Sequence, residues 1–165
     1  MELTLVRSNE RRRPVQHLGT LISAAIFTAM STAASACPDY NQYGAEYRYS
    51  GSDLYSARQF SVVAGGDNNL QSCGFKNNSG YVMTAPDFSF DLYKMGGFDV
   101  EISVLSNCDA MLLVNDAIAN WYYDDDSNGQ ADPKIRISGS DGYLDVWVGT
   151  YNGEYCDATL YLETF

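Results

Sequence analysis

The chain has 165 residues, of which 21 are acidic and ten are basic, and its net charge is −11. A protein this acidic repels nucleic acid and anionic membranes, which excludes both as partners. Its length is enough for one sizeable hydrophobic core but not for two.

The first 36 residues have the features of a secretory signal peptide. Arg11–Arg13 precede an apolar stretch, Leu18–Met30, and three small residues precede Cys37. Small residues there are typical of a cleavage site, and the apolar stretch is too short to span a bilayer. We therefore predict a signal peptide over residues 1–36 and a mature bacterial protein, residues 37–165, that is secreted or periplasmic.

Two other leader types stay open. Acylation of Cys37 would make the chain a lipoprotein, although Ala34 stands where such signals usually carry Leu. Twin-arginine export prefers a bulky apolar pair where this chain has Pro14 and Val15. An ordinary amphipathic helix is disfavoured, because the apolar stretch lacks a polar face. Removing the leader takes away four basic and two acidic residues, so the mature net charge is −13.

Alternating apolar and polar residues dominate the mature chain. The alternation is clearest over Phe88–Leu92 and Phe98–Val104, which predicts half-buried strands. Further strands are predicted at Tyr47–Tyr49, Phe60–Val63, Met111–Val114, Lys134–Ser138, Leu144–Thr150 and Ala158–Glu163. Glycine and asparagine turns separate them, and a turn near Asp116–Ala119 is the one helical candidate. The pattern predicts an all-β single domain, an antiparallel β-sandwich or jelly roll.

The four cysteines are Cys37, Cys73, Cys108 and Cys156, and they allow three pairings. We favour Cys37 with Cys73 and Cys108 with Cys156. The first bond would attach the new N-terminus to the sheet. The second would join the starts of two predicted strands, which would then be neighbours. Zinc binding by four thiolates is the weaker interpretation, because the chain has no C-x-x-C pair and exported proteins meet oxidising conditions.

An acidic segment, Tyr123–Asp132, has the sequence YDDDSNGQAD. Its spacing is typical of a calcium loop, because alternate side chains can supply oxygen ligands and Gly129 allows a sharp turn. The predicted ligands are Asp124, Asp126, Asn128, Gln130 and Asp132. The cofactor that we predict here is therefore Ca²⁺.

The acidic segment also departs from a complete calcium loop. Ile135 occupies the twelfth position, where an EF-hand carries a bidentate glutamate, so a distant carboxylate such as Asp116 or Asp141 would have to complete the site. An exposed charged hairpin loop is the alternative interpretation.

Tyrosine is abundant, with 13 residues, all after the leader. Its ring packs on a pleated surface while its hydroxyl stays in water, so most tyrosines are expected to be structural. Trp121, Tyr122 and Tyr123 could instead form an aromatic platform for a sugar, although sandwich strands often carry such residues.

The last 85 residues or so resemble a known bacterial family. Residues 111–116 read MLLVND, Trp121 and the acidic segment follow, and residues 142–150 read GYLDVWVGT before Ala158. This succession is similar to the pre-peptidase C-terminal domain. The resemblance covers residues 81–165 and implies a compact β-sandwich that acts as a non-catalytic accessory or binding module. It does not cover the N-terminal extension, residues 37–80, whose role it leaves open.

Catalytic residues are scarce. The one histidine, His17, lies in the leader, which excludes Ser-His-Asp, Cys-His and histidine-zinc chemistry from the mature chain. There is no G-x-S-x-G elbow, no S-x-x-K dyad, and no Asp-Thr-Gly or Asp-Ser-Gly triplet. A carboxylate pair for glycoside hydrolysis cannot be judged from sequence, but so short a chain is poorly suited to a deep substrate cleft.

These observations predict a secreted, non-catalytic β-sandwich module that binds an unknown protein or glycan, and not an enzyme. Two alternatives are a peptidase-associated secreted protein that carries a serine-peptidase label, and a calcium-dependent carbohydrate-binding module.

Overall fold

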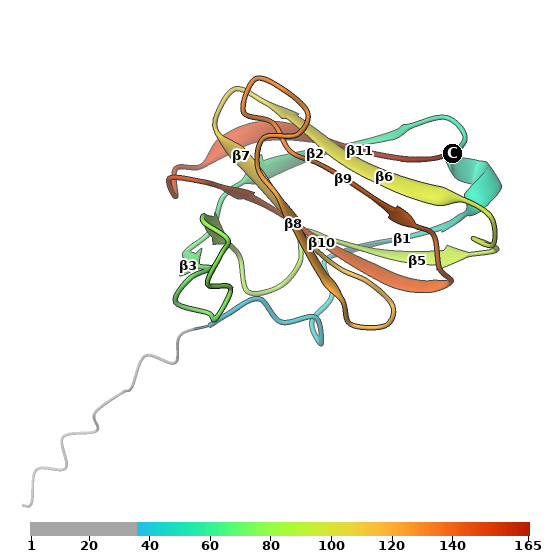
Figure 1. Cartoon of the computed structure of the whole chain (residues 1–165), viewed down its shortest axis with the longest axis horizontal. Helices are drawn as coiled ribbons and strands as arrows, with labels where there is room; N and C mark the ends of the chain where they lie inside the picture. The colour runs from blue at the N-terminus through green and yellow to red at the C-terminus, as the bar shows by residue number, and fades with distance from the viewer. Residues whose placement is uncertain (1–35) are drawn as a thin grey trace, which may run out of the picture. The chain divides into compact units, whose positions relative to one another are not determined.

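The structure is a computed structural model, and it describes residues 36–165 (Figure 1). Except for its last residue, the predicted signal peptide lies outside the described residues. No helix in the described part of the chain has the length and apolar character that crossing a membrane requires.

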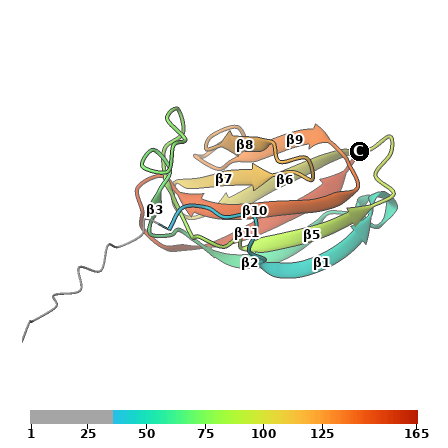
Figure 2. The ribbon, with the colours of Figure 1, turned by 90° about the horizontal axis from the view of Figure 1, so that it is seen from below.

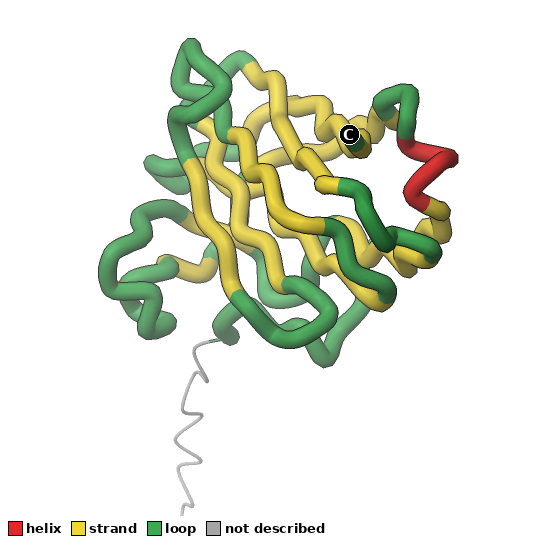
Figure 3. Tube along the Cα trace, turned by 45° about the vertical axis from the view of Figure 1, so that its right-hand side comes forward, coloured by secondary structure: helices red, strands yellow, loops and turns green. Residues whose placement is uncertain are grey.

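Residues 36–165 form eleven strands and one short 3-10 helix (Figure 3). They are β1 (Ala45–Ser50), η1 (Gly51–Leu54), β2 (Arg58–Ala64), β3 (Asn68–Asn69), β4 (Tyr81–Val82), β5 (Phe88–Tyr93), β6 (Asp99–Ser106), β7 (Ala110–Asn115), β8 (Trp121–Asp124), β9 (Lys134–Ser138), β10 (Gly142–Thr150) and β11 (Cys156–Thr164). The predicted all-β class is confirmed. The sequence did not predict η1, which begins with a capping box between Ser50 and Asp53.

The strands form two sheets that make a sandwich (Figure 2). In sheet A, β1, β5, β10, β7 and β8 lie side by side, and the short β4 and β3 extend from the end of β10. Sheet B has the order β2-β11-β6-β9. Neighbouring strands are antiparallel, as predicted, except that β1 and β5 are parallel. This exception arises because the chain crosses to sheet B as β2 between them instead of turning back directly.

The strands of the two sheets differ in burial. In β6, buried residues such as Ile102 and Val104 alternate with more accessible ones, so one face of sheet B is open to solvent. In sheet A, by contrast, all of β7 is buried, and so is β10 from Leu144 to Thr150. A strand buried on both faces needs cover on both. Sheet A is therefore covered on its outer face as well.

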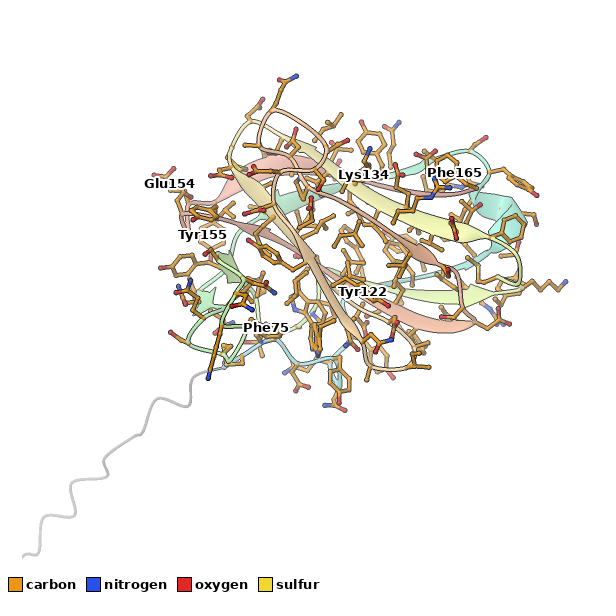
Figure 4. All side chains as sticks on the ribbon, viewed as in Figure 1. Phe75, Tyr122, Lys134, Glu154, Tyr155 and Phe165 are labelled. Atoms are coloured by element: carbon orange, nitrogen blue, oxygen red, sulfur yellow. A yellow bond between two sulfur atoms is a disulfide. The ribbon has the colours of Figure 1, made fainter. Side chains whose placement is uncertain are left out.

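Two apolar cores account for the burial patterns of these strands. The inner core lies between the sheets and includes Phe90 and Val146 from sheet A and Ile102 and Leu160 from sheet B, with Tyr122 packed against it (Figure 4). The outer core lies on the other face of sheet A. It contains Leu70, Val82, Met111, Leu113 and Trp147, with Phe75, Trp121 and Tyr123 packed against it. Removal of apolar surface from water stabilises both cores, by about 25 cal/mol for each Å² that is buried.

Two segments cover the outer face of sheet A. The first, residues 65–87, is called the cover here, and it contributes Leu70 and Val82 to the outer core. The second is the N-terminal segment, residues 37–44. Its Asp39 N–H donates to the carbonyl of Thr84 at 2.8 Å, which ties it to the cover.

Both favoured disulfide bonds are present, Cys37–Cys73 and Cys108–Cys156. The first joins the N-terminal segment to the cover instead of to a strand. The second links the turn between β6 and β7 to the first residue of β11. The expectation that β7 and β11 are neighbours was wrong, because β11 pairs with β6 in sheet B while β7 lies in sheet A. The bond therefore holds the turn that leads from sheet B to sheet A against β11.

Candidate functional site

The acidic segment is the first candidate, and it is not a hairpin loop. It follows β8 in sheet A and precedes β9 in sheet B, so it passes from one sheet to the other. The hairpin interpretation missed β8, whose residues Trp121–Asp124 carry no alternation of apolar and polar side chains.

Three predicted calcium ligands have protein partners. Asp124 accepts hydrogen bonds from the backbone N–H groups of Ser127 at 3.0 Å and Lys134 at 2.8 Å. Asp132 is buried and accepts from the backbone N–H of Ser106 at 3.0 Å and from its hydroxyl at 2.9 Å. The Asn128 amide donates to the carbonyl of Val104 at 3.1 Å. These side chains hold the segment against β6 and β9.

The other two predicted ligands, Asp126 and Gln130, are exposed. Asp126 lies close enough to raise the pKa of Asp109, although burial contributes more to that shift, and Asp125 contributes less. Asp116 and Asp141, which could have completed the site, line a separate cavity described below. Within residues 36–165, no group of three or more carboxylate, cysteine or histidine side chains is placed to hold a metal. Calcium binding by this segment stays a prediction.

The aromatic run of β8 has structural roles. Trp121 packs edge-on to Phe75 and lies 5.3 Å from Trp147 between ring centroids, within the outer core. Tyr122 packs on the inner core and donates its hydroxyl to Asp116 at 2.9 Å. Tyr123 packs on the outer core. Successive strand residues point to opposite faces, so these three rings do not form one platform.

A row of polar side chains crosses sheet A. Its members are Glu46, Ser89, Asp145 and Asn115, which are register partners across β1, β5, β10 and β7. We call them the polar row. Ser89, Asp145 and Asn115 are at most 5% exposed, and Asp145 accepts a hydrogen bond from the Ser89 hydroxyl at 2.5 Å. Directly opposite residues on neighbouring strands have β-carbons about 5 Å apart, so these groups form a continuous polar strip.

A cavity of about 390 Å³ lies over this row and is called the tyrosine cavity. Its lining consists of Tyr40, Tyr43, Asn115, Asp116, Ala117, Ala119, Asp141, Gly142, Tyr143 and Asp145. The N-terminal segment supplies the first two tyrosines, and Tyr43 packs against Tyr143 with ring centroids 5.2 Å apart. Gly142 has φ 123° and lies so close to Ala117 that a β-carbon would come within 2.7 Å of it. A larger residue there would narrow the cavity.

One side-chain oxygen of Asp145 and one of Asn115 have no hydrogen-bond partner in the part of the protein that the structure describes. Asp145 uses Oδ1 for Ser89, and Asn115 donates its amide N–H to the carbonyl of Asn120 at 3.3 Å. Among the described residues, no hydrogen bond reaches Oδ2 of Asp145 or Oδ1 of Asn115. Because no fully enclosed side-chain oxygen in the described part of the chain lacks a partner, both oxygens are accessible to solvent, and both residues line the cavity. The base of the tyrosine cavity therefore presents two free acceptors.

The electrostatics of the cavity favour a hydrogen-bond donor. Burial raises the pKa of Asp145, and the hydrogen bond from Ser89 opposes that rise. Burial also opposes ionisation of Asp116, but hydrogen bonds from Asn120, Tyr122 and Ile118 together lower its pKa. The residues that line the cavity include no lysine, arginine or histidine. A positively charged guest would meet carboxylates with no competing cation in the lining.

A second hollow, of about 420 Å³, lies on the open face of sheet B. Its lining includes small or short side chains such as Ser61, Ser106 and Thr159, and Asp157 is its one carboxylate. No aromatic ring lines it. This lining offers a ligand one carboxylate and no aromatic surface, so the tyrosine cavity is the better candidate.

Sequence reasoning missed the tyrosine cavity. Its residues come from three distant stretches, 40–43, 115–119 and 141–145, which only the sheet pairing brings together. One signal could have found it. Asp145 interrupts an apolar strand between Leu144 and Val146, and a carboxylate in a buried strand is costly unless it has a partner or a function.

Comparison with known proteins gives a limited picture. No family model matches the sequence, and no curated protein matches it. One similar solved structure is the pre-peptidase C-terminal domain of collagenase from Bacillus anthracis, with 15% identity and a TM-score of 0.43, covering 74% of this chain and 99% of that one. It belongs to the family that residues 81–165 resemble.

Another similar structure is PliG of Aeromonas hydrophila, a periplasmic lysozyme inhibitor of g-type lysozyme. The two chains are 12% identical with a TM-score of 0.44, and the match covers 75% of this chain and 99% of that one. Identities and TM-scores this low do not transfer a function.

Proposed function

We propose that this protein is a secreted, non-catalytic binding module and that the tyrosine cavity is its binding site. The observation that carries this proposal is the pair of free oxygens on Asp145 and Asn115 at the base of the cavity. Both residues line the cavity, so N–H or O–H groups of a ligand can replace the water that these oxygens otherwise bind. The exposed tyrosines at its rim suit recognition of a protein surface.

The rest of the chain supports a secreted, non-catalytic role. Two disulfide bonds suit an oxidising compartment such as the periplasm. Residues 37–165 contain no histidine, and no cysteine in the described part is free to act as a nucleophile. The cavity supplies acceptors and rings, which hold a ligand but give no nucleophile with a base beside it.

A glycan is the second candidate ligand, because Tyr40, Tyr43 and Tyr143 expose aromatic surface on which a sugar ring could stack. A peptide library and a glycan array, probed with the same purified protein, would decide between the two. We expect peptide signals that Tyr143→Ala removes. Tyr151→Ala is the matched control, because Tyr151 is similarly exposed but does not line the cavity.

Two results would contradict the proposal. One is a set of ligands that bind equally well to Tyr143→Ala and to the native protein, which would place the site elsewhere. The other is hydrolysis of the peptide library by the purified protein, which would favour the peptidase-associated alternative over a binding module.

A further inference from the structure

The side chains that line the tyrosine cavity are specific enough to indicate the chemical class of its ligand. We propose that it takes the guanidinium group of an arginine side chain on the surface of a protein partner. This inference rests on the proposed function and names its ligand class.

The polar row sets the geometry. Asp145 on β10 and Asn115 on β7 are directly opposite in the register, both line the cavity, and each has one accessible oxygen without a partner in the described chain. Two acceptors side by side match the planar fork of a guanidinium, whose N–H groups point in parallel pairs. An ammonium group presents its donors from a single point and fits such a pair less well. A neutral sugar would leave the buried carboxylate without a countercharge.

Tyrosine rings at the edge of the cavity also favour a guanidinium group. Tyr43 and Tyr143 are 59% and 39% exposed, and their rings pack against each other at the edge of the cavity. Guanidinium groups stack on the faces of tyrosine rings through cation–π attraction. Asp116 and Asp141 add two further carboxylates to the lining. Oδ1 of Asp141 accepts from the backbone N–H of Met95, and no hydrogen bond in the described chain reaches its Oδ2.

A protein is the favoured source of the guanidinium. The tyrosines extend from the cavity to an exposed rim, and Tyr40 is itself 45% exposed, so apolar surface continues beyond the space that one side chain fills. Tyrosine-rich rims of this kind are typical of protein interfaces. The net charge of −11 would also attract a basic partner before contact.

NMR titration with a short peptide, acetyl-Gly-Ser-Arg-Ser-Gly-amide, tests the inference. We expect shifts in the backbone signals of Asn115, Gly142 and Asp145. The same peptide with citrulline in place of arginine keeps the shape and loses the charge, and it should bind at least about tenfold more weakly. Free agmatine carries the same group without a peptide and should bind no more tightly than the arginine peptide.

Two variants complete the test. Asp145→Asn removes the charge, but its side chain can still accept the Ser89 hydrogen bond. We expect this variant to bind the arginine peptide about 10- to 100-fold more weakly. Asp157→Asn makes the same change in net charge on the open face of sheet B and should leave affinity unchanged. Thermal melts of both variants show whether each is folded.

The failures are distinguishable. Equal binding of the citrulline and arginine peptides, or no loss in Asp145→Asn, would overturn the guanidinium inference and leave a binding site at the cavity. Tighter binding of agmatine than of the peptide would overturn the choice of a protein partner. If neither peptide binds while library ligands still depend on Tyr143, the inference fails and the proposed function stands.

Discussion

The outer faces of the two sheets differ in what covers them. Sheet A carries the cover, the N-terminal segment and an outer core of five buried side chains, whereas sheet B exposes polar residues and single apolar ones such as Leu105 and Val63. The site candidate lies where the covering of sheet A leaves a cavity, over buried polar groups. The difference indicates that added layers can create a site, because they desolvate polar groups that an open face would leave in water.

The largest expected effect comes from a comparison of one side chain from each outer face. Trp147→Ala removes the largest side chain of the outer core, and we expect it to lower the free energy of unfolding by about 3–5 kcal/mol. Leu105→Ala, on the open face of sheet B, should cost less than about 1 kcal/mol, because Leu105 is 49% exposed. Urea unfolding measures both. Equal losses would mean that the covering layer adds no stability.

The two disulfide bonds sharpen the comparison, because one holds the covering layer and the other holds the turn between β6 and β7 against β11. We expect Cys37→Ser with Cys73→Ser to cost about 2–4 kcal/mol in stability and to weaken ligand binding at the tyrosine cavity, since Tyr40 and Tyr43 follow Cys37 closely. Cys108→Ser with Cys156→Ser should cost a similar amount but leave binding unchanged. Loss of binding in both pairs would contradict a local role for the first bond.

Asp87 tests the electrostatics of the covered face. Burial raises its pKa to about 7, while a hydrogen bond from the backbone N–H of Val148 at 2.7 Å opposes that rise. Because the folded state binds this proton more tightly than the unfolded state, Asp87 destabilises the fold progressively as pH rises from about 4 to about 7.

We therefore expect Asp87→Asn to be more stable than the native protein at pH 8 by about 1–3 kcal/mol, allowing for partial access to solvent. At pH 3.5 the two should be nearly equal. Urea unfolding at both pH values measures the difference, and Asp157→Asn, on the open face, should show no such gain. A gain that is the same at both pH values would rule out titration of Asp87 as its cause.

The calcium prediction concerns the segment that joins the two sheets, and it gives the smallest effect. If Asp126 and its neighbours bind calcium, a tenfold excess over the dissociation constant adds about 1.4 kcal/mol and raises the melting temperature by a few degrees. Asp126→Ala should abolish that rise without lowering stability in a chelator, since its side chain is exposed. A melting temperature that calcium leaves unchanged would contradict a calcium site here.

Much of the fold could be predicted from local patterns. The alternation around Ile102 identified β6 because one face of that strand is in water, and the composition of an exported chain led to both disulfide bonds. The covered strands β7 and β10 were found as well, but their cover was not. The continuous burial of β7 reflects two apolar layers, and its sequence, AMLLVN, does not say which segment supplies the second one.

The site was harder to predict, for a physical reason. The acidic segment stood out because its carboxylates are close in sequence, yet the structure uses Asp124 and Asp132 to anchor the chain between the sheets. The polar row has one residue from each of several strands, so only strand register brings it together. The parallel pairing of β1 with β5 is part of that register, and no short-range turn indicates it.

The position of β11 affects how the chain must fold. β11 lies between β2 and β6 in sheet B, although it follows both of them in the sequence. Until it arrives, β2 and β6 have no common partner, and the thiol of Cys108 has no Cys156 with which to pair. Pairings over such long sequence separations form slowly. Closure of the Cys108–Cys156 bond therefore requires the chain to reach the first residue of β11, and a chain interrupted before residue 156 would lack β11 and keep a reactive thiol.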